Sequence, residues 1–240
     1  MDKKPEACLI CGAPLIYLMR TCGRTCAVCG GTFPSNACCE RGHFVCDGCH
    51  MQRALEEAMS VCLDESSLDP IAILKTLMGD PCVHMHGPEH HALVGAALLT
   101  AYRNSGGSLD LAAALREMAA RAGRIPGGSC GLWGCCGAAV SAGVFLSIVT
   151  QTTPLSRESW GLCNRMSARA LAAVGEIGGP RCCKRTSFLA AAEAAGFVRE
   201  HLGIEMRLPE PIVCTFSAQN RQCLGRACPF SPLAAHAISS

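Results

Sequence analysis

The distribution of hydrophobic positions changes character near residue 50. Beyond it, apolar residues recur three to four positions apart in stretches rich in Ala, Leu and Met, which is the spacing of an amphipathic helix. The clearest case is SLDLAAALREMAARAGRIPGG, where Ser108 is the predicted N-cap and the Gly- and Pro-rich end stops the helix. Its apolar stripe consists of Leu111, Leu115, Met118 and Ala122. Similar patterns predict six further helices, near residues 50–62, 68–78, 87–104, 135–151, 156–176 and 185–203.

These helices are separated by short breaks that contain Gly or Pro, and no convincing series of strands accompanies them. We therefore predict a mainly α fold, with a helical bundle over residues 51–240. The longest apolar window, GAAVSAGVFLSIV at residues 137–149, is shorter than the roughly 20 residues that cross a bilayer. It is predicted to be a core helix, and no membrane partner is expected.

Residues 1–50 show a different pattern, built on cysteine. Four short ligand pairs follow one another, and each is close enough for a tight turn to direct both side chains at one ion. Eight such ligands make two closed tetrahedral sites, so we predict a small zinc-ribbon or treble-clef-like module that binds about two zinc ions. The predicted ligands are Cys8, Cys11, Cys26, Cys29, Cys39, His43, Cys46 and Cys49.

The order in which these pairs share a metal stays open. Cys26 and Cys29 have plausible partners in Cys8 and Cys11, which gives sequential sites. The stretch CERGHFVCDGC instead resembles RING-like and treble-clef fingers, where alternate pairs can share one zinc. The module is expected mainly to stabilise a segment too small for its own core, with docking of a protein or RNA partner as the alternative.

A competing interpretation involves Cys22 together with Cys26 and Cys29. Their Cys-x3-Cys-x2-Cys spacing is that with which radical S-adenosylmethionine enzymes hold a four-iron cluster. Those enzymes continue into alternating strands and helices, whereas this chain continues into helices. The zinc interpretation is therefore favoured.

The cysteine content and the N-terminal stretch indicate a cellular location. Cysteine accounts for 20 of 240 residues, an abundance typical of disulfide-rich secreted domains. The opening MDKKPEACLI places charges where a signal peptide needs an apolar segment, so we expect a cytoplasmic, reducing location in which cysteines bind metals or exchange electrons. A net charge of +2 argues against duplex DNA as a partner and gives other nucleic acids only weak support.

Half of the histidines lie in one break, PCVHMHGPEHHA. We expect His84, His86 and His90 either to bind a metal or to transfer protons, with Glu89 as the base of a metal-dependent enzyme. A polar surface segment is the alternative. The spacing departs from His-Glu-x-x-His, so a zinc protease is not predicted.

The three remaining breaks are rich in cysteine. GGSCGLWGCCGAA places thiols among glycines at a helix start, whose N–H groups favour thiolates. GGPRCCKR surrounds two cysteines with three cations, Arg181, Lys184 and Arg185, which are expected to lower their pKa values. CTFSAQNRQCLGRACPF ends in Cys-Pro, as ferredoxin-type loops do. Together they predict an iron–sulfur cluster, most simply 4Fe-4S, with ligands drawn from Cys130, Cys135, Cys136, Cys182, Cys183, Cys214, Cys223 and Cys228.

Two other interpretations apply to the same thiols. They can be small core residues, since free cysteine is often buried. The adjacent pairs at 135–136 and 182–183 can also cycle as vicinal disulfides.

The stretches CLICGAPL, GHFVCDGCH, HGPEHH, GGSCGLWGCCGAAVSAG, GGPRCCKR and NRQCLGRACPF resemble a family of uncharacterised cysteine-rich proteins, mainly of anaerobic bacteria and archaea, grouped as a domain of unknown function. The resemblance implies a setting that tolerates oxygen-sensitive clusters and an association with methyltransferase-like proteins. A shorter element, Cys136-Gly137-Ala138-Ala139, is similar to the Gly-Cys-Ala-x-x-Gly element of small redox-associated proteins, with altered order.

The first hypothesis for function is a zinc- and iron–sulfur-binding protein that moves electrons or sulfur with a protein partner. A cysteine not needed by the cluster would carry the sulfur. The alternatives are a zinc-finger scaffold that binds protein or RNA without redox activity, and the metal-dependent enzyme at the histidines.

Overall fold

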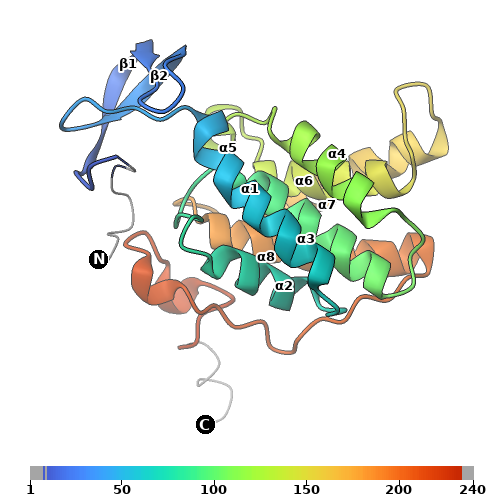
Figure 1. Cartoon of the computed structure of the whole chain (residues 1–240). Helices are drawn as coiled ribbons and strands as arrows, with labels where there is room; N and C mark the ends of the chain where they lie inside the picture. Colours follow the sequence, from blue (N-terminus) through green and yellow to red (C-terminus); the bar gives the residue numbers. More distant parts are fainter. Residues whose placement is uncertain (1–7, 9, 234–240) are drawn as a thin grey trace.

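The computed structural model describes residue 8 and residues 10–233. The N-terminal stretch on which the expected location rests, MDKKPEACLI, lies mostly outside these residues. Within them the chain forms a small N-terminal hairpin and a helical body (Figure 1). The helical body confirms the mainly α fold that the sequence predicts.

The N-terminal hairpin consists of β1 (Leu15–Thr25) and β2 (Thr32–Cys39). The strands are antiparallel, with Leu15 opposite Cys39 and Thr25 opposite Thr32, and the register is irregular between Tyr17 and Cys22. Most of their side chains are exposed. Sequence analysis did not predict this hairpin, because neither strand shows the alternation of a half-buried strand.

The body contains eight α-helices and two short 3-10 helices within the described residues. Seven of the eight α-helices match the predicted ones to within a few residues, and only the short α5 is additional. The helices are α1 (Asp47–Asp64), α2 (Pro70–Gly79), α3 (Glu89–Asn104), α4 (Leu111–Ala122), α5 (Ser129–Leu132), α6 (Gly137–Val149), α7 (Glu158–Ile177) and α8 (Cys183–Leu202), with η1 (Ser217–Gln219) and η2 (Gly225–Ala227).

Two helix starts show how the sequence sets the element boundaries. The Asp69 carboxylate accepts N–H bonds from Ile71 (2.7 Å) and Ala72 (3.1 Å) at the start of α2. At α4 the N-cap is Asp110, whose carboxylate accepts the Ala113 N–H at 3.0 Å. The prediction of Ser108 as this N-cap is wrong, because Asp110 offers an equally good acceptor two residues closer to the apolar stripe.

Helix α3 occupies the centre of the body. Fourteen of its 16 residues are buried, and it contacts α1, α2, α4, α6 and α8 (Figure 1). A helix that is apolar on all sides is stable only inside a core, and the small residues of α3 allow its neighbours to approach closely. At Gly95, for example, a Cβ atom would collide with the Met118 side chain of α4.

The segment after α8 returns along the body to the end where α8 begins (Figure 1). On the way, the Arg207 N–H donates to the Leu68 carbonyl at 2.9 Å. Further on, the Cys214 N–H donates to the Phe230 carbonyl at 2.7 Å, which closes the last stretch into a loop. This return brings Cys214, Cys223 and Cys228 next to the first turn of α8.

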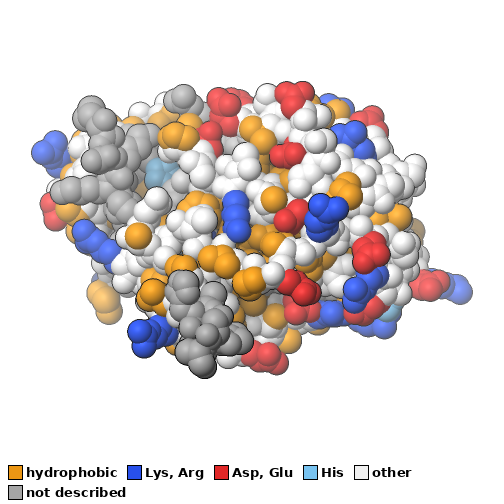
Figure 2. Space-filling model, turned by 90° about the horizontal axis from the view of Figure 1, so that it is seen from below, with side chains coloured by type: hydrophobic (Ala, Val, Ile, Leu, Met, Phe, Trp, Pro, Cys, Tyr) orange, Lys and Arg blue, Asp and Glu red, His pale blue; other side chains and the backbone are white. Residues whose placement is uncertain are grey.

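The surface seen in Figure 2 carries basic and acidic side chains interspersed across its described residues. This distribution agrees with the small net charge. No helix in the described part of the chain combines the length and the apolar character that crossing a membrane requires.

Close packing of α6 against α7 leads to a stability prediction. A Cβ atom at Gly143 would lie 3.0 Å from the Cys163 carbonyl oxygen and would collide with the Ser167 hydroxyl. Gly143→Val should therefore lower the free energy of unfolding by about 1 to 3 kcal/mol, the usual cost of overpacking. Chemical denaturation followed by circular dichroism measures it.

The matched control is Gly175→Val in α7. A Cβ atom there has no neighbour within 4 Å, so we expect a change near zero or a small gain from better helix propensity. Equal stability of the two variants would contradict the close α6–α7 contact.

Candidate metal centres

Two groups of four metal-ligating side chains form at the N-terminal end. One contains Cys8, Cys11, Cys39 and His43, and the other contains Cys26, Cys29, Cys46 and Cys49. Within each group the potential ligand atoms all lie within 4.8 Å of one another. These are the eight predicted ligands, and each group could hold a metal ion such as zinc.

Individual distances agree with tetrahedral coordination. A zinc ion with Zn–S bonds of about 2.3 Å places its sulfur ligands about 3.8 Å apart. In the first group the Cys11 and Cys39 sulfur atoms are 3.9 Å apart, and His43 Nδ1 lies 3.2 Å from the Cys11 sulfur. In the second group the Cys29 and Cys46 sulfur atoms are 3.8 Å apart.

The groups are crossed along the chain, because the first and third ligand pairs share one group and the second and fourth share the other. The suggested pairing of Cys26 and Cys29 with Cys8 and Cys11 is therefore wrong. The hairpin explains the difference, since it returns the chain so that Cys39, the last residue of β2, lies opposite Leu15 at the start of β1, four residues after Cys11. Cys22 belongs to neither group and is exposed on β1, which removes the geometric basis for the radical S-adenosylmethionine interpretation.

Backbone N–H groups surround the thiols of these groups. The Cys46 and Val28 N–H groups donate to the Cys26 sulfur at 3.3 and 3.4 Å. Burial acts to raise the pKa of Cys26, but these bonds outweigh it and lower the pKa to about 6. In the other group the pKa of Cys39 falls to about 7 for the same reasons, with His43 N–H as a donor. In each group one thiol therefore has a pKa lowered towards neutral pH, which favours the thiolate that binds metal.

The N-terminal groups are joined directly to the body. Cys46 is the N-cap of α1 and Cys49 lies in its first turn, so this helix crosses the expected domain boundary at residue 50. Asp47 in the same turn accepts the Gly127 N–H at 3.0 Å, and Tyr17 of β1 accepts a bond from the Arg181 guanidinium at 3.3 Å. The module therefore contacts two of the cysteine-rich breaks.

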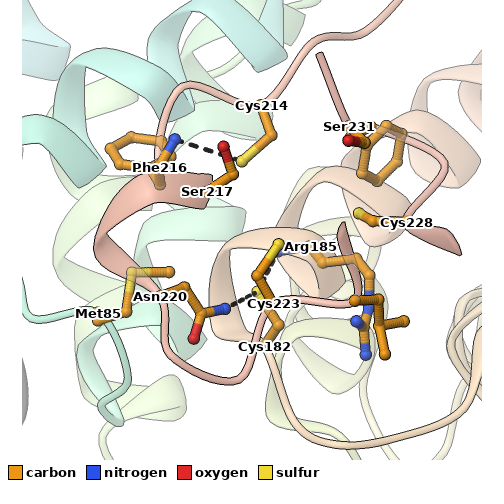
Figure 3. Close-up of a pocket in the computed structure, with 12 residues that line it drawn as sticks. Met85, Cys182, Arg185, Cys214, Phe216, Ser217, Asn220, Cys223, Cys228 and Ser231 are labelled. Carbon is orange, nitrogen blue, oxygen red and sulfur yellow. Dashed lines mark hydrogen bonds between the residues drawn. The ribbon is translucent and has the colours of Figure 1, made fainter. Parts of the chain in front are cut away.

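A third set of cysteines lines a hollow at the start of α8 (Figure 3). Cys182 comes from the helix start, and the other three come from the returning C-terminal segment. Around them lie Met85, Phe216, Asn220 and Arg185. The four cysteines are Cys182, Cys214, Cys223 and Cys228.

Three of these sulfur atoms accept backbone N–H bonds from residues two or three positions further along the chain. The donors are Arg185 to Cys182 at 3.4 Å, Phe216 to Cys214 at 3.3 Å and Gly225 to Cys223 at 3.4 Å. The Asn220 amide donates a further bond to Cys182 at 3.3 Å. Such bonds stabilise negative charge on sulfur, as at iron–sulfur sites.

The four cysteines of the hollow do not form a group like the two at the N-terminal end. In the described residues, no three of them form a group with all distances within 4.8 Å, whereas one tetrahedral ion needs about 3.8 Å. The hollow itself has a free volume of about 10 Å³, which is room for about one water molecule. The hollow therefore differs from the two N-terminal groups, whose ligand atoms are all close enough to share one ion.

Cations near the hollow lower the thiol pKa values by less than burial raises them. Burial raises the pKa of Cys182 and of Cys214, and raises that of Cys183 to about 12. The cations bind carbonyl oxygens: Lys184 donates to Met78 at 3.1 Å, and Arg185 donates to Gly178 and Pro180, both at 2.8 Å. The expectation that these cations lower the thiol pKa values is wrong for Cys182, Cys183 and Cys214, because desolvation dominates.

Lys184 is itself unusual, since its side chain is almost fully buried. Burial lowers its pKa to about 8, while Glu89 and the neighbouring thiols oppose the shift. Its ammonium group lies 4.8 Å from the centre of the Phe216 ring. A positive charge at this depth is stabilised by added negative charge nearby, which a metal-bound set of thiolates would supply.

The other four cysteines of the predicted pool lie outside the hollow. Cys183 interacts electrostatically with Cys136, Glu89 and Arg181, and Arg181 also interacts with Cys130. Cys135 lies between Cys130 and Cys136 in the loop that leads into α6. The eight cysteines of the predicted pool therefore form two sets. Cys182 belongs to the set that lines the hollow, and Cys183 belongs to the second set, with Cys130, Cys135 and Cys136.

All cysteines in the described residues are free thiols. Cys182 and Cys183 face different surroundings, which does not favour a vicinal disulfide between them. The core interpretation is supported for Cys136, Cys182 and Cys228, which are buried and belong to the hydrophobic core of the body. It also applies to Cys62, which is fully buried and has its pKa raised to about 11 by burial.

The histidine-rich segment does not converge into a metal-binding group among the described residues. His86 bonds through Nε2 to Asn220 Oδ1 at 3.3 Å, whereas His90 bonds through Nδ1 to the Gly87 carbonyl at 3.1 Å. Burial, with the nearby Lys184 charge, lowers the pKa of His90 to about 3. A metal role of His84, His86 and His90 therefore stays a prediction, which no group among the described residues supports.

Glu89 is fully buried at the start of α3. Its carboxylate accepts the His84 backbone N–H at 3.0 Å and lies 3.6 Å from His90 Nδ1. It also covers Gly87 so closely that a Cβ atom there would collide with it. This enclosure suits a structural carboxylate that orders the loop better than a base that must reach substrate.

Asn220 is a site residue that sequence analysis missed. Its side chain is 7% exposed and contacts both the cysteine hollow and His86. The sequence offers only an indirect signal, an Asn three residues before Cys223 in NRQC, where Asn favours turns.

Comparison with known proteins found a match to one family model, a family of unknown function (DUF5714), over residues 58–231. No curated protein and no solved structure matches the chain. The matched region contains all four cysteines of the hollow, the histidine-rich segment and the loop before α6. It begins after both N-terminal ligand groups. Since the match spans more than half of its length, the chain belongs to this family of unknown function.

Proposed function

We propose that the protein is an electron- or sulfur-transfer protein that binds two zinc ions at its N-terminus and one iron–sulfur cluster in the body. The observation that carries the proposal is the convergence of Cys182, Cys214, Cys223 and Cys228 on one hollow. Four cysteines match the ligand number of a 4Fe-4S cluster. These four ligands are half of the eight cysteines that the sequence predicts as candidate ligands.

Three features of the hollow support a cluster. In the described residues its four sulfur atoms do not form a group close enough to share a single ion, and N–H groups donate to three of the sulfur atoms. The buried Lys184 and Arg185 provide positive charge beside it, which offsets the negative charge of four thiolates. Since the free space is small, we expect the loop of residues 214–228 to shift outward on binding.

A bound cluster supplies one-electron chemistry. In this protein the four cysteines of the hollow would bind the cluster. The backbone N–H groups and the Asn220 amide would donate hydrogen bonds to their sulfur atoms, and the surrounding side chains would limit access of water. In a sulfur-transfer role, an additional thiol is needed outside the ligand set. Cys130 is the exposed cysteine of the second set, so it is the candidate sulfur carrier.

A zinc-finger scaffold without redox activity is the second candidate. It is favoured by apolar side chains that the hairpin exposes, such as Tyr17 and Met19, because exposed apolar residues can serve as a docking surface. Anaerobic purification separates the two functions. Iron, sulfide and absorbance near 400 nm are expected for the first, whereas a colourless protein containing only zinc would favour the scaffold.

The zinc groups are tested by double substitutions in the full chain. Cys8 and Cys39 share one group, whereas Cys8 and Cys26 belong to different groups. Cys8→Ser with Cys39→Ser should therefore remove about one of two zinc ions, and Cys8→Ser with Cys26→Ser should remove both. Metal analysis after gel filtration measures the content.

Sequential sites predict the reverse result for these two variants, because Cys8 and Cys26 would then share an ion. That reversal would refute the crossed arrangement. A wild-type protein that folds without zinc would refute zinc binding at these groups altogether.

The cluster ligands are tested by a pair of double variants. Cys214→Ser with Cys228→Ser removes two thiols of the hollow, and serine lacks the soft thiolate that iron–sulfur clusters require. We expect loss of iron and sulfide after anaerobic reconstitution, with zinc unchanged.

The matched control is Cys130→Ser with Cys135→Ser, which alters two thiols outside the hollow. This variant should retain iron and sulfide. Loss of the cluster in the control but not in the first variant would show that the loop before α6, rather than the hollow, supplies the ligands.

A further inference from the structure

Asn220 occupies a central position beside the proposed cluster ligands. It is buried between the hollow and the histidine-rich segment, and Figure 3 shows its amide directed at Cys182. Its backbone carbonyl accepts the Cys223 N–H at 3.1 Å. One residue therefore contacts two of the four cysteines.

The orientation of the Asn220 amide is determined by its neighbours. Oδ1 accepts the Gln222 backbone N–H at 2.9 Å, and a backbone N–H can only donate. Nδ2 must then face Cys182, where it donates to the sulfur atom at 3.3 Å. Reversing the amide would place an acceptor against the sulfur and lose both bonds.

His86 provides a second constraint on the same oxygen. Its Nε2 lies 3.3 Å from Asn220 Oδ1, and because that oxygen is an acceptor, Nε2 carries the hydrogen. The bonds thus form a chain from His86 through Asn220 to Cys182. This chain gives part of the histidine-rich segment a role that does not require it to bind a metal.

From this geometry we propose that Asn220 is a positioning residue that sets the reduction potential of the cluster, with His86 holding its amide in the donating orientation. The inference rests on the proposed function. Reduction adds negative charge to a cluster and its thiolates, and N–H donors to sulfur stabilise the more negative state. Loss of the Asn220 donor therefore shifts the potential to a more negative value.

The test compares two variants of the full chain, each of which replaces one amide side chain with leucine. Asn220→Leu removes the donor at similar size, whereas Gln219→Leu removes an exposed amide one residue earlier in the same turn. Both proteins and the wild type are reconstituted anaerobically, and the midpoint potential is measured by redox titration. We expect a negative shift for Asn220→Leu and no shift for Gln219→Leu, with equal iron content in all three.

A third variant, His86→Phe, covers the case in which Asn220→Leu does not load a cluster. It leaves the Asn220 amide in place but removes one bond that orients it, so we expect a smaller negative shift. An unchanged potential in whichever variant loads would overturn the inference, as would a shift in Gln219→Leu of the same size. Loss of the cluster in both Asn220→Leu and His86→Phe would also overturn it, because a positioning role leaves the ligands in place.

The outcome also separates this inference from the proposal on which it rests. A wild-type protein without iron and sulfide overturns the proposed function and the inference together. A loaded wild type, with variants whose potential does not change, overturns only the role of Asn220.

Discussion

Burial of helix α3 is the constraint on which the rest of the body depends. A helix without a polar face cannot remain in water, so other helices must cover every side of it. Five of them do so. Its first turn carries Glu89, His90 and His91, all buried, and these polar groups need partners at that end of the core. The loop before α3 provides the His84 N–H and the Gly87 carbonyl, and the loop after α4 provides the Ile125 carbonyl. The loop before α3 adjoins the cysteine hollow through Met85.

The N-terminal module is stabilised differently. Its own buried cluster consists of Cys8, Ala13 and Cys39, which is far too small to stabilise a hairpin with exposed strands. Ligand groups within metal-binding distance can substitute for a core, because binding free energy becomes folding free energy. Cys46 and Cys49 lie at the start of α1. This helix therefore connects one ligand group of the module directly to the helical body.

The hollow near α8 combines groups that are costly to bury separately. Thiols there have raised pKa values because they are desolvated, while Lys184 has a lowered pKa for the same reason. Opposite charges brought together in one buried region reduce each other's cost. A metal that converts the thiols to thiolates would therefore complete an environment that the protein has already built from N–H donors, Asn220 and two cations. The same desolvation explains why the pKa values of Cys182 and Cys214 lie above their ordinary value despite the neighbouring cations.

Much of this structure could be predicted from local sequence. Helical periodicity located seven helices, because burial of one face imposes a spacing that can be counted along the chain. The four N-terminal ligand pairs were equally clear, since two ligands on one tight turn are a local property. Which pairs share an ion was decided by the hairpin, whose strands show no burial pattern. Likewise, the sequence treats Cys182 and Cys183 as one motif, although the side chains of adjacent residues at a helix start point in different directions. Only the return of the C-terminal segment selects Cys182 for the hollow and supplies Asn220 beside it, because contacts between distant segments depend on the packing of the whole chain.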